Sequence, residues 1–141
     1  MDEAESMALV MLVGTDAALL EGVAQTLGSA GHRVRLAHGL EEARRVAAQD
    51  APMLLVVERS LAVEARTLGV RTAPGGATVL FRVAGGDGAT LPAALQRSVL
   101  AEVTLPLERQ RLTALASSVV ERAHQVGRSR AETPPEEHRR I

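Results

Sequence analysis

The chain has 141 residues and a net charge of −1, and it contains no Cys, no Lys, no Trp and no Tyr, with Phe81 as its single aromatic residue. This length suits one domain that buries a core without disulfide support. Without Lys, neither a Schiff-base enzyme nor a phosphate-loop NTPase is possible, and without Cys there is no thiolate metal site or thiol nucleophile. One Phe cannot stack single-stranded bases, and dispersed arginines at this net charge give no general reason to bind DNA. We therefore expect no nucleic-acid partner for this domain.

The first third of the chain alternates between apolar runs and an amphipathic segment. Residues 8–13, ALVMLV, predict a buried strand that ends at the GTD sequence of residues 14–16. Apolar residues then recur at helical spacing over 20–27, and Asp16 is the expected N-cap of that helix. Residues 33–37, RVRLA, alternate as expected for an edge strand.

The middle of the chain carries the most informative strand. Residues 40–49 predict a second amphipathic helix, and the five apolar residues 53–57 predict a strand buried on both faces. That strand ends abruptly at Glu58. Ser60 is the expected N-cap of a weaker helix over residues 61–68.

The remaining pattern continues the alternation. Residues 78–83 and 100–104 predict two more strands, separated by a short helix over 91–98. A long helix is expected from about residue 107, with an apolar stripe that reaches Val126. The domain is expected to span residues 8–127, with residues 1–7 a disordered N-terminus and residues 128–141 a polar tail or linker.

Five alternations of strand and helix predict an α/β fold, a flavodoxin-like (CheY-like) doubly wound, five-stranded parallel sheet with helices on both faces. In such a fold the functional site lies at the C-terminal ends of the strands. The residues expected there are Gly14, Thr15, Asp16, Glu58, Arg59, Val83, Ala84, Leu105 and Pro106.

At this point the sequence resembles the receiver domains of two-component response regulators. The resemblance spans roughly residues 8–126, in spacing and topology more than in identity. It rests on LVMLVGTDAALLEGVAQTLGSAGH for the first strand and helix, on PMLLVVE for the strand that ends in a phosphoacceptor, and on EVTLPL for the fifth strand with its proline. The resemblance implies a phosphoacceptor Asp, an acidic pair, a hydroxyl residue and a Lys, which together hold Mg²⁺ and an aspartyl phosphate.

The sequence departs from the receiver pattern at nearly every functional position, and the resemblance therefore implies a degenerate receiver, or pseudo-receiver. The substituted positions are Gly14 and Thr15 for the acidic pair, Glu58 for the phosphoacceptor, Val83 for the hydroxyl residue, Leu105 for the Lys and Glu102 for a switch aromatic. Pro106 is retained. Because Mg²⁺ needs several carboxylate oxygens, Glu58 and Asp16 are too few for a good site. We therefore predict no metal, no cofactor, no phosphorylation and no enzymatic activity.

Two side chains at the strand ends each have two interpretations. Glu58 is either a partial mimic of the phosphorylated state or a polar residue that a degenerate site tolerates. Arg82, inside an apolar strand, either extends to the strand end and pairs with Glu58 or indicates a shorter strand. The four His residues show no metal-binding spacing, and surface or edge positions are expected for them, among them His32 and His38.

Two functions from different classes follow. The first is a protein–protein interaction module in bacterial signal transduction, whose partner is a signalling protein or an appended output domain. The alternative is a small-ligand or nucleotide sensor, which requires a pocket with convergent polar groups at the strand ends. The N-terminus MDEAES is acidic and no apolar run approaches the ~18 residues of a membrane span, so we expect a cytoplasmic protein without membrane association.

The resemblance also implies a partner face made by the fourth helix, the fifth strand and the fifth helix. The residues expected on it are Arg97, Glu102, Glu108, Arg109 and Arg111. Charges of both signs on one patch suit a polar, self-complementary interface, and a homodimer through this face is one expectation. An exposed end of the apolar stripe near Val126 is a second place where another chain would pack.

Overall fold

A computed structural model describes residues 9–65, 67–83 and 90–132, and in these parts a five-stranded parallel sheet has the strand order β2-β1-β3-β4-β5. The strands are β1 (Leu9–Val13), β2 (Arg33–Ala37), β3 (Leu54–Glu58), β4 (Ala77–Val83) and β5 (Ala101–Leu105). The helices are α2 (Ala17–Ser29), α3 (Leu40–Gln49), α4 (Arg59–Ala65), α5 (Ala93–Ser98) and α6 (Arg109–Glu132). The predicted flavodoxin-like fold is confirmed.

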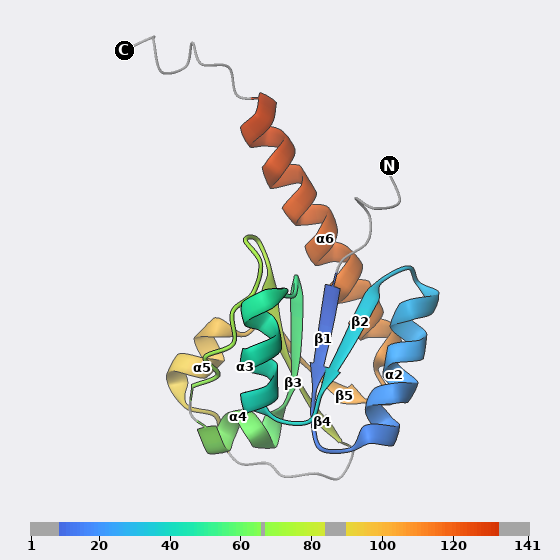
Figure 1. Ribbon diagram of the computed structural model, residues 1–141, viewed down its shortest axis with the longest axis vertical. Coiled ribbons are helices and arrows are strands. Elements are labelled where there is room, and N and C mark those ends of the chain that lie inside the picture. The colour runs from blue at the N-terminus through green and yellow to red at the C-terminus, as the bar shows by residue number, and fades with distance from the viewer. Residues whose placement is uncertain (1–8, 66, 84–89, 133–141) are drawn as a thin grey trace.

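Two apolar cores lie on the two faces of the sheet. One core packs α2 and α6 against residues such as Val10, Val56 and Phe81, and the other packs α3, α4 and α5 against Met11 and Leu55 (Figure 1). All of β1 is buried, and so is β3 up to Val57, because helices cover both faces of the sheet at these strands. This arrangement accounts for the two uninterrupted apolar runs in the sequence.

Two of the local predictions are confirmed and the predicted cap at Ser60 is wrong. Asp16 caps α2, where its carboxylate accepts a hydrogen bond from the backbone N–H of Leu19 at 3.1 Å. The strand β2 is an edge strand with exposed Arg33 and Arg35. Ser60 is not an N-cap, because α4 begins one residue earlier, at Arg59.

The last helix continues beyond the domain boundary expected at residue 127. It ends at Glu132, and it extends past the N-terminal edge of the sheet (Figure 1). The side chain of Val126 lies outside the described part of the chain, as do residues 1–8 and 133–141. Within the described residues, no helix combines the length and the apolar character needed to cross a bilayer.

Candidate functional site

The side chain of Glu58 is the centre of the polar contacts at the C-terminal ends of β1 and β3. Its Oε1 accepts hydrogen bonds from the backbone N–H of Thr15 at 2.9 Å and from the Thr15 hydroxyl at 3.1 Å. Its Oε2 accepts a hydrogen bond from the hydroxyl of Ser60 at 2.9 Å. The carboxylate therefore ties the end of β3 to the loop between β1 and α2, and both of its oxygens are engaged within the chain.

A buried glycine and a buried aromatic ring occupy the space beside this carboxylate. A Cβ placed on Gly14 would lie 3.0 Å from Cζ of Phe81 and 3.2 Å from Oε1 of Glu58. Phe81 is 1% exposed and is paired in register with Glu58 on the neighbouring strand. The first position of the expected acidic pair therefore has no room for a side chain unless the ring moves.

Sequence reasoning did not identify Phe81 as part of the site, and it assigned a different role to Ser60. Phe81 lies inside an apolar strand, two residues before Val83, and its apposition to Gly14 depends on the register of three strands. The bond from Ser60 has a local signal, since the hydroxyl is only two residues beyond the carboxylate it contacts.

The other predicted site residues do not join this cluster. Leu105 is fully buried in the core that contains Phe81 and Leu112. Val83 is 39% exposed, Pro106 is exposed, and Asp16 serves as the cap of α2. Among the described positions, the structure brings together Gly14, Thr15 and Glu58, with Arg59 directly after Glu58, whereas Ala84 lies outside the described residues. Within residues 9–65, 67–83 and 90–132, no three His, Asp or Glu side chains gather as metal ligands.

An ion pair next to the site joins the end of β3 to the edge of the sheet. Nε of Arg59 lies 3.0 Å from Oε2 of Glu102, and the Arg59 side chain is only 13% exposed. This pair bridges β3 and β5, which lie on opposite sides of β4. Glu102, at the position of the switch aromatic, is therefore held by an internal partner.

Both interpretations of Arg82 are wrong. The strand β4 continues to Val83, so it is not shortened, and Arg82 is exposed without an ion pair to Glu58. Arg82 instead lines a cavity of about 480 Å³ that it shares with Glu102, Thr104, Leu107, Glu108 and Arg111.

The outer edge of β5 is partly closed by Glu108, which directly precedes α6, and by Arg111 in the first turn of α6. The backbone N–H of Thr104 donates to Oε1 of Glu108 at 2.7 Å, and the Glu108 backbone N–H donates to the Thr104 carbonyl at 2.7 Å. Nη1 of Arg111 donates to the carbonyl of Glu102 at 3.1 Å. Both glutamates of the predicted partner face are thus engaged inside the molecule.

A second cavity, of about 410 Å³, lies at the opposite end of the strands. Its lining includes the start of β4 at Gly75–Ala77, the turn at Ser98–Leu100 and Arg122 of α6. Neither this cavity nor the one beside β5 is lined by Thr15, Asp16 or Glu58. These two cavities therefore do not supply the strand-end pocket around Glu58 that a ligand sensor requires.

Comparison with known proteins places this geometry in a structural group. No family model matches the sequence, and no curated protein matches it. NtrX from Brucella abortus in complex with ADP is 21% identical with a TM-score of 0.66, and the match covers 89% of this chain and 29% of NtrX.

Two further solved structures are matched over almost their full length. A response regulator receiver domain protein from Clostridium thermocellum is 14% identical with a TM-score of 0.64, covering 84% of this chain and 98% of that one. A CheY-like receiver domain protein from Methanospirillum hungatei is 18% identical with a TM-score of 0.62, covering 85% and 99%. The chain therefore has the fold of response-regulator receiver domains.

Proposed function

We propose that this chain is a receiver-like interaction module of two-component signalling that works without phosphorylation. The observation that carries the proposal is the Phe81 ring against Gly14, directly beside the Glu58 carboxylate. In a receiver the acidic pair begins at this position and helps to hold the metal, whereas here a Cβ on residue 14 would meet an apolar ring. The proposed module works without Mg²⁺ and without an enzymatic step of its own.

The charge balance at the site supports the same proposal. An acyl phosphate on a strand end brings about two negative charges, which need a cation or several hydrogen-bond donors to stabilise them. The chain contains no Lys, and the lysine position is occupied by the buried side chain of Leu105. Thr15 and Ser60 already donate hydrogen bonds to Glu58, so this carboxylate maintains one conformation of the β1–α2 loop. This holds whether Glu58 is a partial mimic of the phosphorylated state or a polar residue that a degenerate site tolerates.

The first prediction is that the protein stays unmodified when incubated with acetyl phosphate or phosphoramidate and Mg²⁺. Intact-mass spectrometry should show no gain of one phosphate, because Glu58 is hydrogen-bonded and the acidic pair and the Lys of a receiver are absent. The Glu58→Asp variant is the matched control, since it supplies the usual acceptor but restores neither the Lys nor the acidic pair. It should also stay unmodified. A phosphate on residue 58 of the unaltered chain would contradict the proposal.

The partner face has a different electrostatic character from the one expected. Glu102 and Glu108 are paired internally, whereas Arg97, Arg109 and Arg82 are exposed without a carboxylate partner among the described residues. The Leu107 side chain, 74% exposed, lines the cavity beside β5 together with Arg82 and Arg111. The unpaired charges on this face are therefore positive, and we infer that it recognises an acidic partner surface in preference to a second copy of itself.

The second prediction concerns self-association. Because two cationic faces repel each other, sedimentation equilibrium at low ionic strength should give the same mass for the unaltered chain and for Arg109→Glu. Arg33→Glu, on the opposite edge of the sheet, serves as the charge-matched control. A dimer that Arg109→Glu abolishes and Arg33→Glu preserves would support the homodimer interface instead.

A further inference from the structure

One polar residue is buried far from the site described above. His32, between α2 and β2, is 7% exposed and is the single buried polar or charged residue in the described part of the chain. Sequence reasoning expected a surface or edge position, and that expectation is wrong. The misleading signal was local: His32 stands in the polar turn SAGHR, and its burial comes from α6, which is more than 80 residues away in the sequence.

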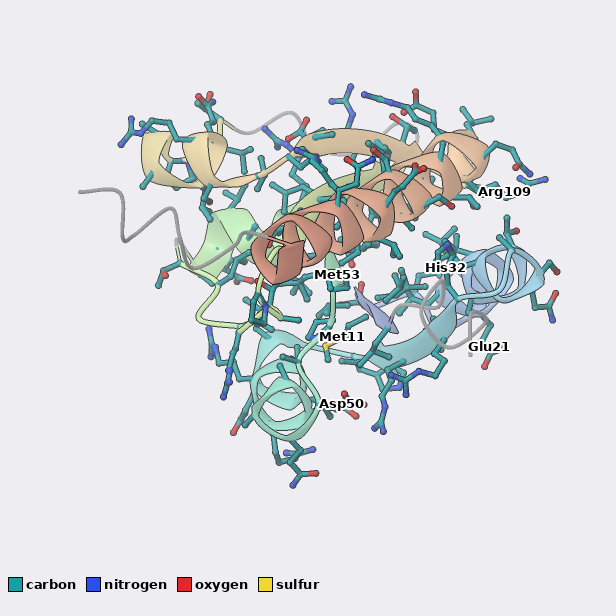
Figure 2. All side chains as sticks on the ribbon, turned by 90° about the horizontal axis from the view of Figure 1, so that it is seen from above. Met11, Glu21, His32, Asp50, Met53 and Arg109 are labelled. Atoms are coloured by element: carbon teal, nitrogen blue, oxygen red, sulfur yellow. The ribbon has the colours of Figure 1, made fainter. Side chains whose placement is uncertain are left out.

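The imidazole of His32 is poorly satisfied where it lies. Its Nε2 is 3.5 Å from the hydroxyl of Ser117 on α6, and its Nδ1 has no hydrogen-bond partner. The backbone N–H donates to the carbonyl of Leu27 and fixes the turn at the end of α2. Figure 2 shows His32 beside α2, on the side that faces α6. The ring therefore sits at the junction between the α2–β2 turn and the longest helix.

Among the described residues, no carboxylate is placed to accept a hydrogen bond from a protonated His32 imidazole at this junction. The charged residues with described side chains on the elements around it are Glu21 of α2, Arg33 and Arg35 of β2, and Arg109, Arg111, Glu121 and Arg122 of α6. None forms an ion pair with His32, and the Arg33 guanidinium lies 3.8 Å from Asp50. Glu121 is exposed, one helical turn beyond Ser117 on α6. A positive charge on the ring would therefore be buried without compensation.

We propose that His32 forms a pH-sensitive packing contact between α6 and the α2–β2 turn. The neutral imidazole keeps α6 packed against this turn, and protonation of the imidazole weakens the contact and releases α6. This inference is independent of the proposed signalling function. The α6 helix is the element that extends beyond the sheet, so loosening its junction with α2 would change the orientation of whatever α6 carries or contacts. The expected effect is local to α2, β2 and α6, and the strand-end contacts of Glu58 are unaffected.

The sign of the pH dependence follows from burial. Desolvation lowers the pKa of His32 below its ordinary value of 6.5, so the unfolded or opened state binds a proton more readily than the closed state. The His32 contribution to stability is fully present above pH 6.5. It is lost as the pH falls from 6.5 towards the lowered pKa of the closed state.

The third prediction tests this by amide hydrogen exchange in the full chain. Below pH 6.5, protection factors in α6 and at the α2–β2 turn should fall by up to about tenfold per pH unit, the value for uptake of one proton on opening. The decline should stop where the closed state itself becomes protonated. His32→Leu should abolish this pH dependence, and His38→Leu, which alters an exposed histidine, should leave it unchanged.

A second variant keeps the test decisive if His32→Leu is poorly folded. Ser117→Asp places a carboxylate near Nε2 of His32, which should raise the pKa of the imidazole. The pH dependence of exchange in α6 should then reverse, so that α6 becomes better protected as the pH falls through the raised pKa. The proposal is overturned if exchange in α6 shows no pH dependence beyond its intrinsic rate. It is also overturned if the dependence persists in His32→Leu, or if Ser117→Asp behaves like the unaltered chain.

Discussion

Replacing Phe81 with alanine is expected to lower the free energy of unfolding by about 3–5 kcal/mol, the usual cost of deleting a buried aromatic ring. Phe81 is 1% exposed, contacts the core beneath α2 and α6, and fills the space beside Gly14. The cavity left behind would adjoin the Glu58 carboxylate, so its collapse is limited by the hydrogen bonds that Thr15 and Ser60 donate. Urea denaturation followed by circular dichroism measures this loss.

Val83→Ala is the matched control for Phe81→Ala. Val83 lies two residues further along the same strand but is 39% exposed, so its truncation should change stability by less than about 0.5 kcal/mol. Equal losses for the two variants would mean that the ring is not packed as described. The argument that the ring crowds out a side chain at residue 14 would then lose its physical basis.

Gly14→Asp, which restores the first acidic position of a receiver, should destabilise the chain by more than about 3 kcal/mol through overpacking and the burial of a second carboxylate. The new Cβ alone would lie 3.0 Å from the Phe81 ring, and the added charge would stand beside Glu58. Gly14→Ala separates the two contributions, because it carries the steric cost of about 1–3 kcal/mol without the charge. The same urea titration provides all three values.

A double-mutant cycle links these two variants. If the ring is what excludes a side chain at residue 14, Phe81→Ala should relieve part of the cost of Gly14→Asp. The combined loss should then fall short of the sum by about 1–2 kcal/mol, within the range found for residues in contact. Strict additivity would show that Phe81 and residue 14 do not compete for space.

The sequence was sufficient for those features that depend on local pattern. The apolar runs 8–13 and 53–57 predicted two central strands, the alternation in 33–37 predicted the edge strand, and Asp16 predicted a helix cap. Each depends on residues within one turn or one strand. Because strand and helix alternate regularly, these local features were enough to predict the sheet as well.

The features that were missed depend on contacts between distant segments. Phe81 on β4 lies against Gly14 at the end of β1, and Arg59 pairs with Glu102 on β5. His32 is covered by α6. No spacing in the sequence encodes such contacts, since they depend on strand register and on which helix packs over which turn. Ser60 was misassigned for a different reason: the helix starts at Arg59, two residues before the expected start at residue 61, so the expected cap is instead a side-chain donor to Glu58.

The hydrogen bonds along the outer edge of β5 affect whether copies of this chain associate through their sheets at high concentration. Unpaired edge strands are templates on which sheets of separate molecules join and grow into fibrils. Here the Thr104 N–H and both the Thr104 and Glu102 carbonyls are already bonded to Glu108, directly before α6, and to Arg111 in its first turn, so a docking strand would first have to displace these two residues. At the other end of the sheet, β2 presents Arg33 and Arg35, which share one carboxylate, Asp50, so that a net positive charge remains and opposes the alignment of two copies in register. Polymerisation through the sheet is thus discouraged at both ends by different means, engaged hydrogen-bonding groups at one and net charge at the other.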